Sequence, residues 1–210
     1  MSDQIAWPKL RYPLVAILRG IRPQEVRAIV GALIETGFEA IEIPLNSPDP
    51  FVSIEQAVKL SPDNVLIGAG TVLNVKDVER LNDVGGRLLV SPNVEPDVIS
   101  RAATHGMVTM PGVLTPTEAF TAIRAGASAL KFFPASVLGA DGIKAMSAVL
   151  PKDVPLGAVG GVSEAGFKTY RDAGVSCFGL GSSLYKAGFS AAEVRERAKR
   201  SVDAWDRIAG

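Results

Sequence analysis

Residues 155–182, PLGAVGGVSEAGFKTYRDAGVSCFGLGS, carry the pattern that decides the fold. The apolar run Pro155–Gly161 ends in two glycines, a segment with helical spacing follows, and a second apolar run, Cys177–Ser182, ends in another glycine-rich turn. Short runs rich in Val, Leu and Ala are typical of strands that are buried on both faces of a parallel sheet. This stretch therefore predicts a strand, a helix and a second, parallel strand.

The same unit recurs along the whole chain, with a repeat of about 23 residues that a compact βα unit can fill. The predicted strands are Leu14–Arg19, Ala40–Leu45, Val65–Val72, Arg87–Pro92, Met107–Gly112, Ala129–Pro134, Pro155–Gly161 and Cys177–Ser182. Eight βα units in series favour a (β/α)8 TIM barrel. The rival, an open doubly wound sheet, usually carries a glycine-rich turn after its first strand, where this chain has only Gly20. We expect one barrel domain over residues 1–210, with an extra N-terminal helix at Ser2–Leu10.

Helix-terminating residues support this division of the chain. Asn74 is placed to cap a helix over Val75–Val84, and Thr115 with Glu118 has the spacing of a capping box. Ser163 is placed to cap the next-to-last helix, and Ser190–Ile208 is an amphipathic last helix. Glycines are expected to end five helices: Gly37, Gly85, Gly106, Gly126 and Gly174.

Composition excludes several classes of function. Lys and Arg total 22, as do Asp and Glu, so the net charge is zero and neither a nucleic acid nor a membrane surface is an expected partner. A zinc site draws mostly on Cys and His, and the chain has one of each, Cys177 and His105. The lone cysteine indicates a reducing compartment, and the stretch 1–10 lacks the apolar run of a signal peptide. His105 precedes the fifth strand, on the stability face of a barrel, where we expect a structural role.

Lys131 is the most informative residue, because it stands inside the apolar strand ALKFFP at 129–134. Lysine is rarely buried without a partner or a function. One interpretation is a structural ion pair, or a side chain that extends out of the barrel mouth. The other is a Schiff-base nucleophile, whose amine burial and a nearby cation such as Arg19 would keep neutral.

Glu42 is likewise a charged residue inside an apolar predicted strand, AIEIPL at 40–45. A carboxylate in this position forms either a buried salt bridge to Arg19 or Lys131, or a proton shuttle whose pKa is raised by burial. The two interpretations are compatible in one residue.

The last two strands end in glycines that predict a phosphate site. Gly160 and Gly161 end the seventh predicted strand, and Gly181 and Ser182 end the eighth. Glycines let the backbone N–H groups approach an anion, and the loops after strands 7 and 8 are the usual phosphate site of such barrels. Tight turns alone would also explain either loop. Thr71, near the end of the third predicted strand, adds a hydroxyl at the same end of the barrel.

Taken together and in order, seven segments resemble the 2-keto-3-deoxy-6-phosphogluconate / 6-phosphogalactonate aldolase family. These segments are VAILRG at 15–20, EIPLNSP at 42–48, IGAGTV at 67–72, SPN at 91–93, PG at 111–112, LKFFP at 130–134 and AVGGV at 158–162. The resemblance runs from about Leu14 to Lys186.

This resemblance implies a class I aldolase that uses neither a metal nor a cofactor. Lys131 matches the Schiff-base lysine and Glu42 the general acid/base, while Arg19 and Thr71 match substrate-contacting positions. The phosphate-binding backbone is matched by four residues: Gly160, Gly161, Gly181 and Ser182. The resemblance also implies a cytoplasmic homotrimer that acts on a phosphorylated keto-deoxy sugar acid and yields pyruvate and glyceraldehyde 3-phosphate.

The end of the second strand separates two branches of that family. The phosphogluconate branch carries an arginine and a threonine after the leucine, whereas this chain has Asn46 and Ser47 after Leu45. We therefore expect the phosphogalactonate branch, with a phosphogluconate or dual-specificity enzyme as the alternative. Outside the aldolases, a metal-free sugar-phosphate isomerase or epimerase would use Glu42 as a base and Lys131 as an electrostatic clamp. A non-catalytic sugar-phosphate sensor and a magnesium-assisted aldolase are further alternatives.

Overall fold

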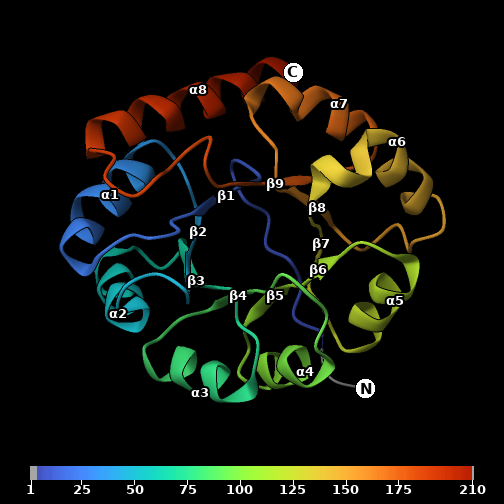
Figure 1. The fold of residues 1–210 in the computed structure, drawn as a ribbon, viewed down its shortest axis with the longest axis horizontal. Coiled ribbons are helices and arrows are strands. Elements are labelled where there is room, and N and C mark those ends of the chain that lie inside the picture. The colour runs from blue at the N-terminus through green and yellow to red at the C-terminus, as the bar shows by residue number, and fades with distance from the viewer. Residues whose placement is uncertain (1–3, 210) are drawn as a thin grey trace.

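A ring of helices surrounds a closed barrel of parallel strands in the computed structural model, which describes residues 4–209 (Figure 1). The strands are β1 (Leu14–Ile17), β2 (Ala40–Pro44), β3 (Leu66–Gly70), β4 (Leu88–Val90), β5 (Val108–Met110), β6 (Gly112–Val113), β7 (Leu130–Phe132), β8 (Leu156–Val159) and β9 (Cys177–Leu180). The helices are α1 (Pro23–Glu35), α2 (Pro50–Leu60), α3 (Val75–Asp83), α4 (Pro96–Thr104), α5 (Pro116–Arg124), α6 (Ala135–Ser147), α7 (Phe167–Asp172) and α8 (Ala191–Ala209). The expected (β/α)8 barrel is confirmed.

Nine strands form because the fifth expected strand, Met107–Gly112, is divided at Pro111. The sheet runs in the order β5-β4-β3-β2-β1-β9-β8-β7-β6, and its two ends, β5 and β6, are joined through this proline. Proline has no N–H to give to a neighbouring strand, so regular pairing is interrupted there. Its carbonyl still accepts from the Lys131 N–H at 2.9 Å, and the Ala129 N–H donates to Thr109 at 3.0 Å. Strands β5 and β6 together therefore take the place of one strand in the barrel.

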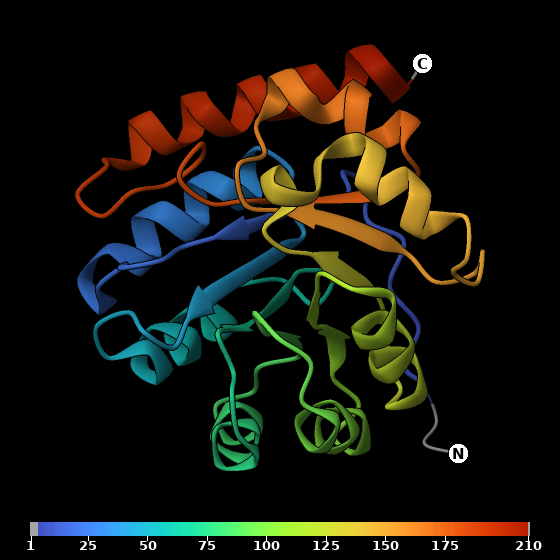
Figure 2. The same cartoon turned by 45° about the vertical axis from the view of Figure 1, so that its right-hand side comes forward.

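The barrel wall has apolar side chains on both faces, as strands between a packed interior and a helical layer require. Every residue of β1 and β2 is buried. Outward-facing side chains such as Leu14 and Ile41 join the large cluster beneath the helices, whereas Val15 and Val90 belong to a smaller interior cluster. Helix α8 closes the ring beside α1 and α7 (Figures 1 and 2).

The predicted helix ends are largely confirmed. The Asn74 side chain accepts from the Asp77 N–H at 3.0 Å, and Thr115 forms the capping box with Glu118. All five glycines predicted to end helices have positive φ, between 71° and 101°: Gly37, Gly85, Gly106, Gly126 and Gly174. The prediction for Ser163 is wrong, because its side chain makes no capping hydrogen bond and a 3-10 turn, Glu164–Gly166, intervenes before α7.

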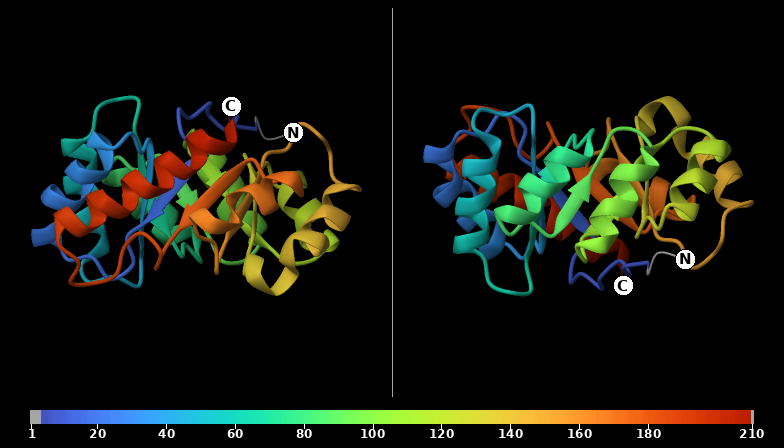
Figure 3. Two further views of the ribbon diagram at one scale, coloured as in Figure 1. Left: turned by 90° about the horizontal axis from the view of Figure 1, so that it is seen from above. Right: turned by 90° about the horizontal axis from the view of Figure 1, so that it is seen from below.

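The extra N-terminal helix is also not observed, because residues 4–10 have no regular secondary structure, while Ser2 and Asp3 lie outside the described residues. Pro8 explains part of this result, since the residue before a proline disfavours helical backbone. The segment instead lies across one end of the barrel, opposite the β9–α8 connection (Figure 3). There the Gln4 amide donates to the Ala127 carbonyl at 2.8 Å, and Ile5 and Trp7 pack against the interior cluster.

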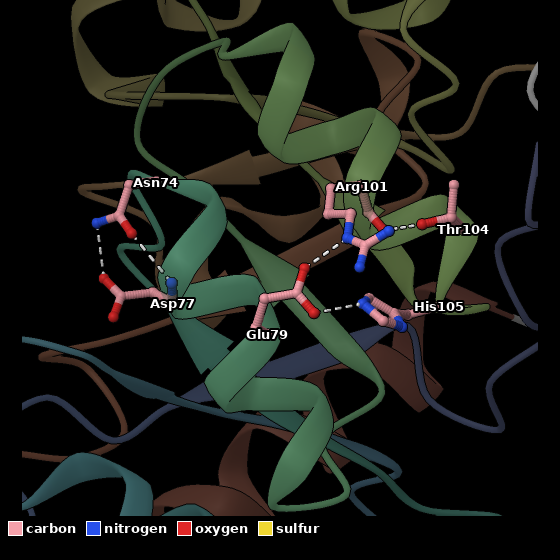
Figure 4. A network of polar contacts seen from close by, with 6 residues as sticks. All are labelled: Asn74, Asp77, Glu79, Arg101, Thr104 and His105. Atoms are coloured by element: carbon pink, nitrogen blue, oxygen red, sulfur yellow. Dashed lines mark hydrogen bonds and ion pairs between the residues drawn. The ribbon is translucent and has the colours of Figure 1, made fainter.

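His105 lies in a polar network between neighbouring helices (Figure 4). Its Nε2 is 3.0 Å from Glu79 Oε2, and the other carboxylate oxygen accepts from Arg101 Nε at 2.5 Å. The network links α3 to the end of α4, which agrees with a structural role for this histidine.

Residues 4–209 have neither a membrane-spanning helix nor a cluster of metal-binding side chains. None of the helices there is long and apolar enough to cross a membrane. In the same part of the chain, no three His, Cys, Asp or Glu side chains lie together in a way that could hold a metal ion.

Candidate active site

A cavity of about 600 Å³ opens at the ends of β1, β8 and β9. Five of the residues singled out from the sequence line it: Arg19, Gly160, Gly161, Gly181 and Ser182. They come together because parallel strands bring all their carboxyl ends to one end of the barrel. Lys131, Glu42 and Thr71 are not part of this wall.

Lys131 lies deeper, at the centre of β7, with 5% of the residue exposed. Its neighbours in register on the adjacent strands are Gly112 and Gly157, and neither has a side chain to fill the barrel beside it. The amine lies 4.8 Å from the centroid of the Phe133 ring. Phe133 also lines the cavity and so connects Lys131 to it.

Burial lowers the pKa of the Lys131 amine to about 8, because a charged ammonium is poorly solvated inside the barrel. The negative charge of Glu42 opposes this effect, and the positive charge of Arg19 adds to it. A substantial fraction of the amine is therefore neutral, and nucleophilic, slightly above neutral pH.

Glu42 is held on β2 with 3% of the residue exposed. A Cβ atom on Gly70 would lie 2.1 Å from Glu42 Oε2, so the glycine at the end of β3 leaves the space that the carboxylate occupies. Oε2 is buried and has no hydrogen-bond partner among the described residues. Burial raises the pKa of Glu42 to about 7, although Lys131 and Arg19 both act in the opposite direction. Near neutral pH this group can both accept and donate a proton.

The geometry disfavours the interpretation of these two residues as a structural salt bridge. Within residues 4–209, the ion pairs closer than 4.0 Å are all at exposed or half-buried positions and include neither Glu42 nor Lys131. A buried charge that has no close partner is costly, which is the reason that both groups are held partly neutral.

Arg19 follows β1 and is fixed by the loop after β2. Its Nη1 donates to the Asn46 side-chain oxygen at 2.5 Å, and the Gly20 N–H donates to the Ser47 hydroxyl at 2.9 Å. Asn46 and Ser47 thus join the first two strand ends, and their polar side chains at that position were the signal in the sequence. Their role as partners of Arg19 and Gly20 was not predicted.

Thr71 directly follows β3 with φ of +58°. A β-branched residue rarely takes this left-handed conformation, which costs of order 1–3 kcal/mol. It immediately follows Gly70, the glycine that accommodates Glu42. Thr71 is therefore adjacent in sequence to the glycine beside Glu42, and it is not among the residues of the cavity wall.

The two glycine turns differ in backbone conformation and in the space around their glycines. Gly160 and Gly161 have φ of +90° and +76°, and a Cβ on Gly161 would lie 2.6 Å from the Cβ of Ser136. The Ser136 N–H donates to the Gly160 carbonyl at 3.1 Å, which ties the turn to the start of α6. At Gly181 no atom lies within 4 Å of a Cβ position. After Gly181 the chain forms a turn, in which the N–H groups of Leu184 and Tyr185 donate to the Gly181 carbonyl.

The arrangement combines three chemical capacities. A partly neutral amine can attack a carbonyl carbon, and a neighbouring carboxyl group can carry protons near neutral pH. The glycine turns line the adjoining cavity and have no side chains to keep a ligand from their backbone.

Comparison with known proteins identifies relatives over the full length of the barrel. Residues 9–205 match the family model described as KDPG and KHG aldolase. A probable 2-dehydro-3-deoxy-6-phosphogalactonate aldolase of Rhizobium meliloti is 65% identical, covering 99% of this chain and 98% of its own. The 2-dehydro-3-deoxy-6-phosphogalactonate aldolase of Escherichia coli is 50% identical, covering 93% and 95%. A solved structure described as native KDPGal has a TM-score of 0.94 and 48% identity, covering 97% of this chain and 98% of that one.

Proposed function

The chain belongs to the KDPG and KHG aldolase family, and from this premise we propose that it cleaves 2-dehydro-3-deoxy-6-phosphogalactonate to pyruvate and D-glyceraldehyde 3-phosphate. The observation that carries the proposal is the pair of buried groups, Lys131 and Glu42, held without a close ion pair at the centre of the barrel. The substrate follows from the names of the relatives at 65% and 50% identity, and from Asn46 and Ser47 at the end of β2.

The reaction begins at Lys131. The neutral Nζ attacks the C2 ketone, and the resulting carbinolamine loses water to form an iminium ion while Glu42 supplies the proton. Glu42, now a carboxylate, takes the proton of the C4 hydroxyl. The C3–C4 bond breaks, its electron pair moves into the iminium to give an enamine, and the aldehyde leaves. Glu42 returns the proton to C3, and water hydrolyses the imine to pyruvate and free Lys131.

We assign substrate binding to the remaining residues. Arg19 and Thr71 face the carboxylate half of the substrate, and backbone N–H groups of Gly160, Gly161, Gly181 and Ser182 hold the phosphate. Binding energy from the distant phosphate can position the C3–C4 bond and so raise turnover, not only affinity.

Trapping of the covalent intermediate tests the mechanism. The protein is mixed with pyruvate, reduced with borohydride, and examined by intact mass and peptide mapping, with Lys131→Met as the control. One reduced pyruvyl group on Lys131, unaffected by a chelator, is expected. If folded protein forms no adduct, the aldolase mechanism is wrong and the isomerase interpretation, which needs no covalent bond, takes its place.

Comparison of the two C4 epimers tests the substrate. Purified protein is assayed with the phosphogalactonate and phosphogluconate forms, and the released pyruvate is measured. A higher kcat/KM for the phosphogalactonate form is expected. Equal values would instead identify a dual-specificity enzyme.

We further propose a cytoplasmic homotrimer. Phosphorylated sugar acids are retained inside cells, where a free thiol such as Cys177 stays reduced. Exposed apolar side chains near the starts of α2 and α3, among them Val52 and Leu73, offer an apolar surface for subunit contact. Sedimentation equilibrium should give three times the mass of the chain.

A further inference from the structure

Lys186 lies in the wall of the cavity that also contains both glycine turns. Its position follows from the local backbone, because the N–H groups of Leu184 and Tyr185 both donate to the Gly181 carbonyl at 2.9 Å. These bonds curl residues 181–185 into one tight turn, and Lys186 is the next residue after it. The following residue, Ala187, lies against the β1–α1 loop, 3.3 Å from the Cβ position of Gly20.

The ammonium group of Lys186 is available for a ligand. The residue is exposed, and none of the ion pairs closer than 4.0 Å in the described chain involves it. Lys59 and Lys168, by contrast, each pair with a carboxylate four residues away on their own helix.

The charged residues of the cavity wall indicate a role for Lys186 in substrate binding. Arg19 and Lys186 are the charged side chains of its wall, which contains no acidic residue. The proposed substrate carries two anionic groups, a carboxylate near the reacting carbons and a phosphate at the other end. The positive charge of Arg19 acts on Lys131 and Glu42, which places this cation near the reacting end. The glycine turns offer N–H groups but no full positive charge.

We propose that Lys186 is a further substrate-binding residue, whose ammonium group pairs with the phosphate held by the two glycine turns and thereby sets the preference for phosphorylated substrates. The proposal rests on the function proposed above. A charge-assisted contact of this kind is stronger than a neutral hydrogen bond and favours a dianionic phosphate over a neutral hydroxyl.

The test compares Lys186→Met and Lys186→Arg with the unaltered protein on two substrates, the 6-phosphorylated keto-deoxy acid and its unphosphorylated form. Lys186→Met should lower kcat/KM for the phosphorylated substrate roughly tenfold or more, since hydrogen bonds to charged groups are worth this much. It should lower kcat/KM for the unphosphorylated form much less, and Lys186→Arg should retain most of the activity. Inorganic phosphate should also inhibit Lys186→Met less strongly than it inhibits the unaltered protein.

Lys168→Met is the matched control, because it removes the same charge from an exposed helix position away from the cavity. An equal loss on both substrates, or no loss on either, would overturn the role of Lys186. Failure of the unaltered protein to release pyruvate from the phosphorylated acid would instead contradict the proposed function, so the two failures are distinct.

Discussion

The Asn46 side chain accepts a hydrogen bond of 2.5 Å from Arg19 Nη1, across the gap between the first two strand ends. Arginine has a long, flexible side chain, and this bond restrains it at the mouth of the barrel. The position that we expect to separate the two branches of the family therefore holds, in this chain, the arginine whose charge acts on Lys131 and Glu42.

Loss of the Arg19–Asn46 hydrogen bond should lower activity, because Arg19 would no longer be held in position. We expect Asn46→Ala to lower kcat/KM about tenfold, the cost of one hydrogen bond to a charged group. In a double-mutant cycle, Asn46→Ala should add little to Arg19→Met, because the second change removes what the first one positions. Asn93→Ala, an exposed amide after β4, serves as the control. Fully additive losses would contradict a positioning role for Asn46.

The pH dependence of imine formation should report the Lys131 amine. Its pKa of about 8 means that the rate of adduct formation with pyruvate rises with pH and levels off above that value. Arg19→Met should move this midpoint to higher pH, since the arginine lowers the pKa of Lys131. The measurement is borohydride trapping over short times from pH 6 to 10. A midpoint near the ordinary lysine value of about 10.4 would show that the amine is not perturbed.

Glu42→Gln should affect adduct formation on Lys131 and cleavage of the C3–C4 bond to different extents. The amide cannot carry the C4 proton, so turnover should fall by roughly 100-fold to 10,000-fold, the usual contribution of a general acid/base. Adduct formation with pyruvate should slow but remain detectable. The measurements are steady-state pyruvate release and trapping on the same protein sample. Undiminished turnover would remove Glu42 from the proposed mechanism.

The same substitution should raise stability above neutral pH. The pKa of Glu42 rises from 4.5 to about 7 on folding, so the folded state binds more protons than the unfolded state between these values. Stability is therefore lost as pH increases through this range, by up to about 3 kcal/mol. Glu42→Gln removes that loss. Urea unfolding should show a more stable variant at pH 8 and a smaller difference at pH 4.5, whereas a difference independent of pH would contradict this account.

The two glycine turns should respond differently to an added methyl group. Gly161→Ala requires positive φ and meets Ser136 at 2.6 Å, so we expect a loss of about 1 kcal/mol or more in stability together with weaker phosphate binding. Gly181→Ala has free space and no such backbone demand, so its stability should change by less than about 0.5 kcal/mol. A selective increase in KM for the phosphorylated substrate is expected of Gly181→Ala. Equal unfolding midpoints for the two variants would contradict the distinction.

Local patterns predicted most of the fold because each helix end depends on neighbours in sequence. Asn74, Thr115 and the terminating glycines act within a few residues, so their spacing alone identifies the caps. The division of the fifth strand at Pro111 has a visible signal as well, since proline lacks an N–H. The irregular course of residues 4–10 depends instead on distant contacts, such as that of Gln4 with Ala127.

The candidate site was likewise predictable only where its signal is local in the sequence. Lys131 and Glu42 stand out in the sequence because each interrupts an apolar strand. The Arg19–Asn46 bond joins residues 27 positions apart, and Lys186 shares a cavity with the glycine turn of β8 because β8 and β9 pair side by side. Such relationships require the register of neighbouring strands, which the sequence alone does not supply.

The space shared by Glu42 and Gly70 also affects how this barrel can be redesigned. A methyl group at position 70 would lie 2.1 Å from the carboxylate, so the two positions divide one fixed volume between them. In libraries of variants that change only position 42 or only position 70, we expect most proteins to be inactive. A shorter acid at position 42 combined with a small side chain at position 70 keeps the total volume and moves the proposed proton carrier, so we expect new activities on this scaffold when both codons are randomised together.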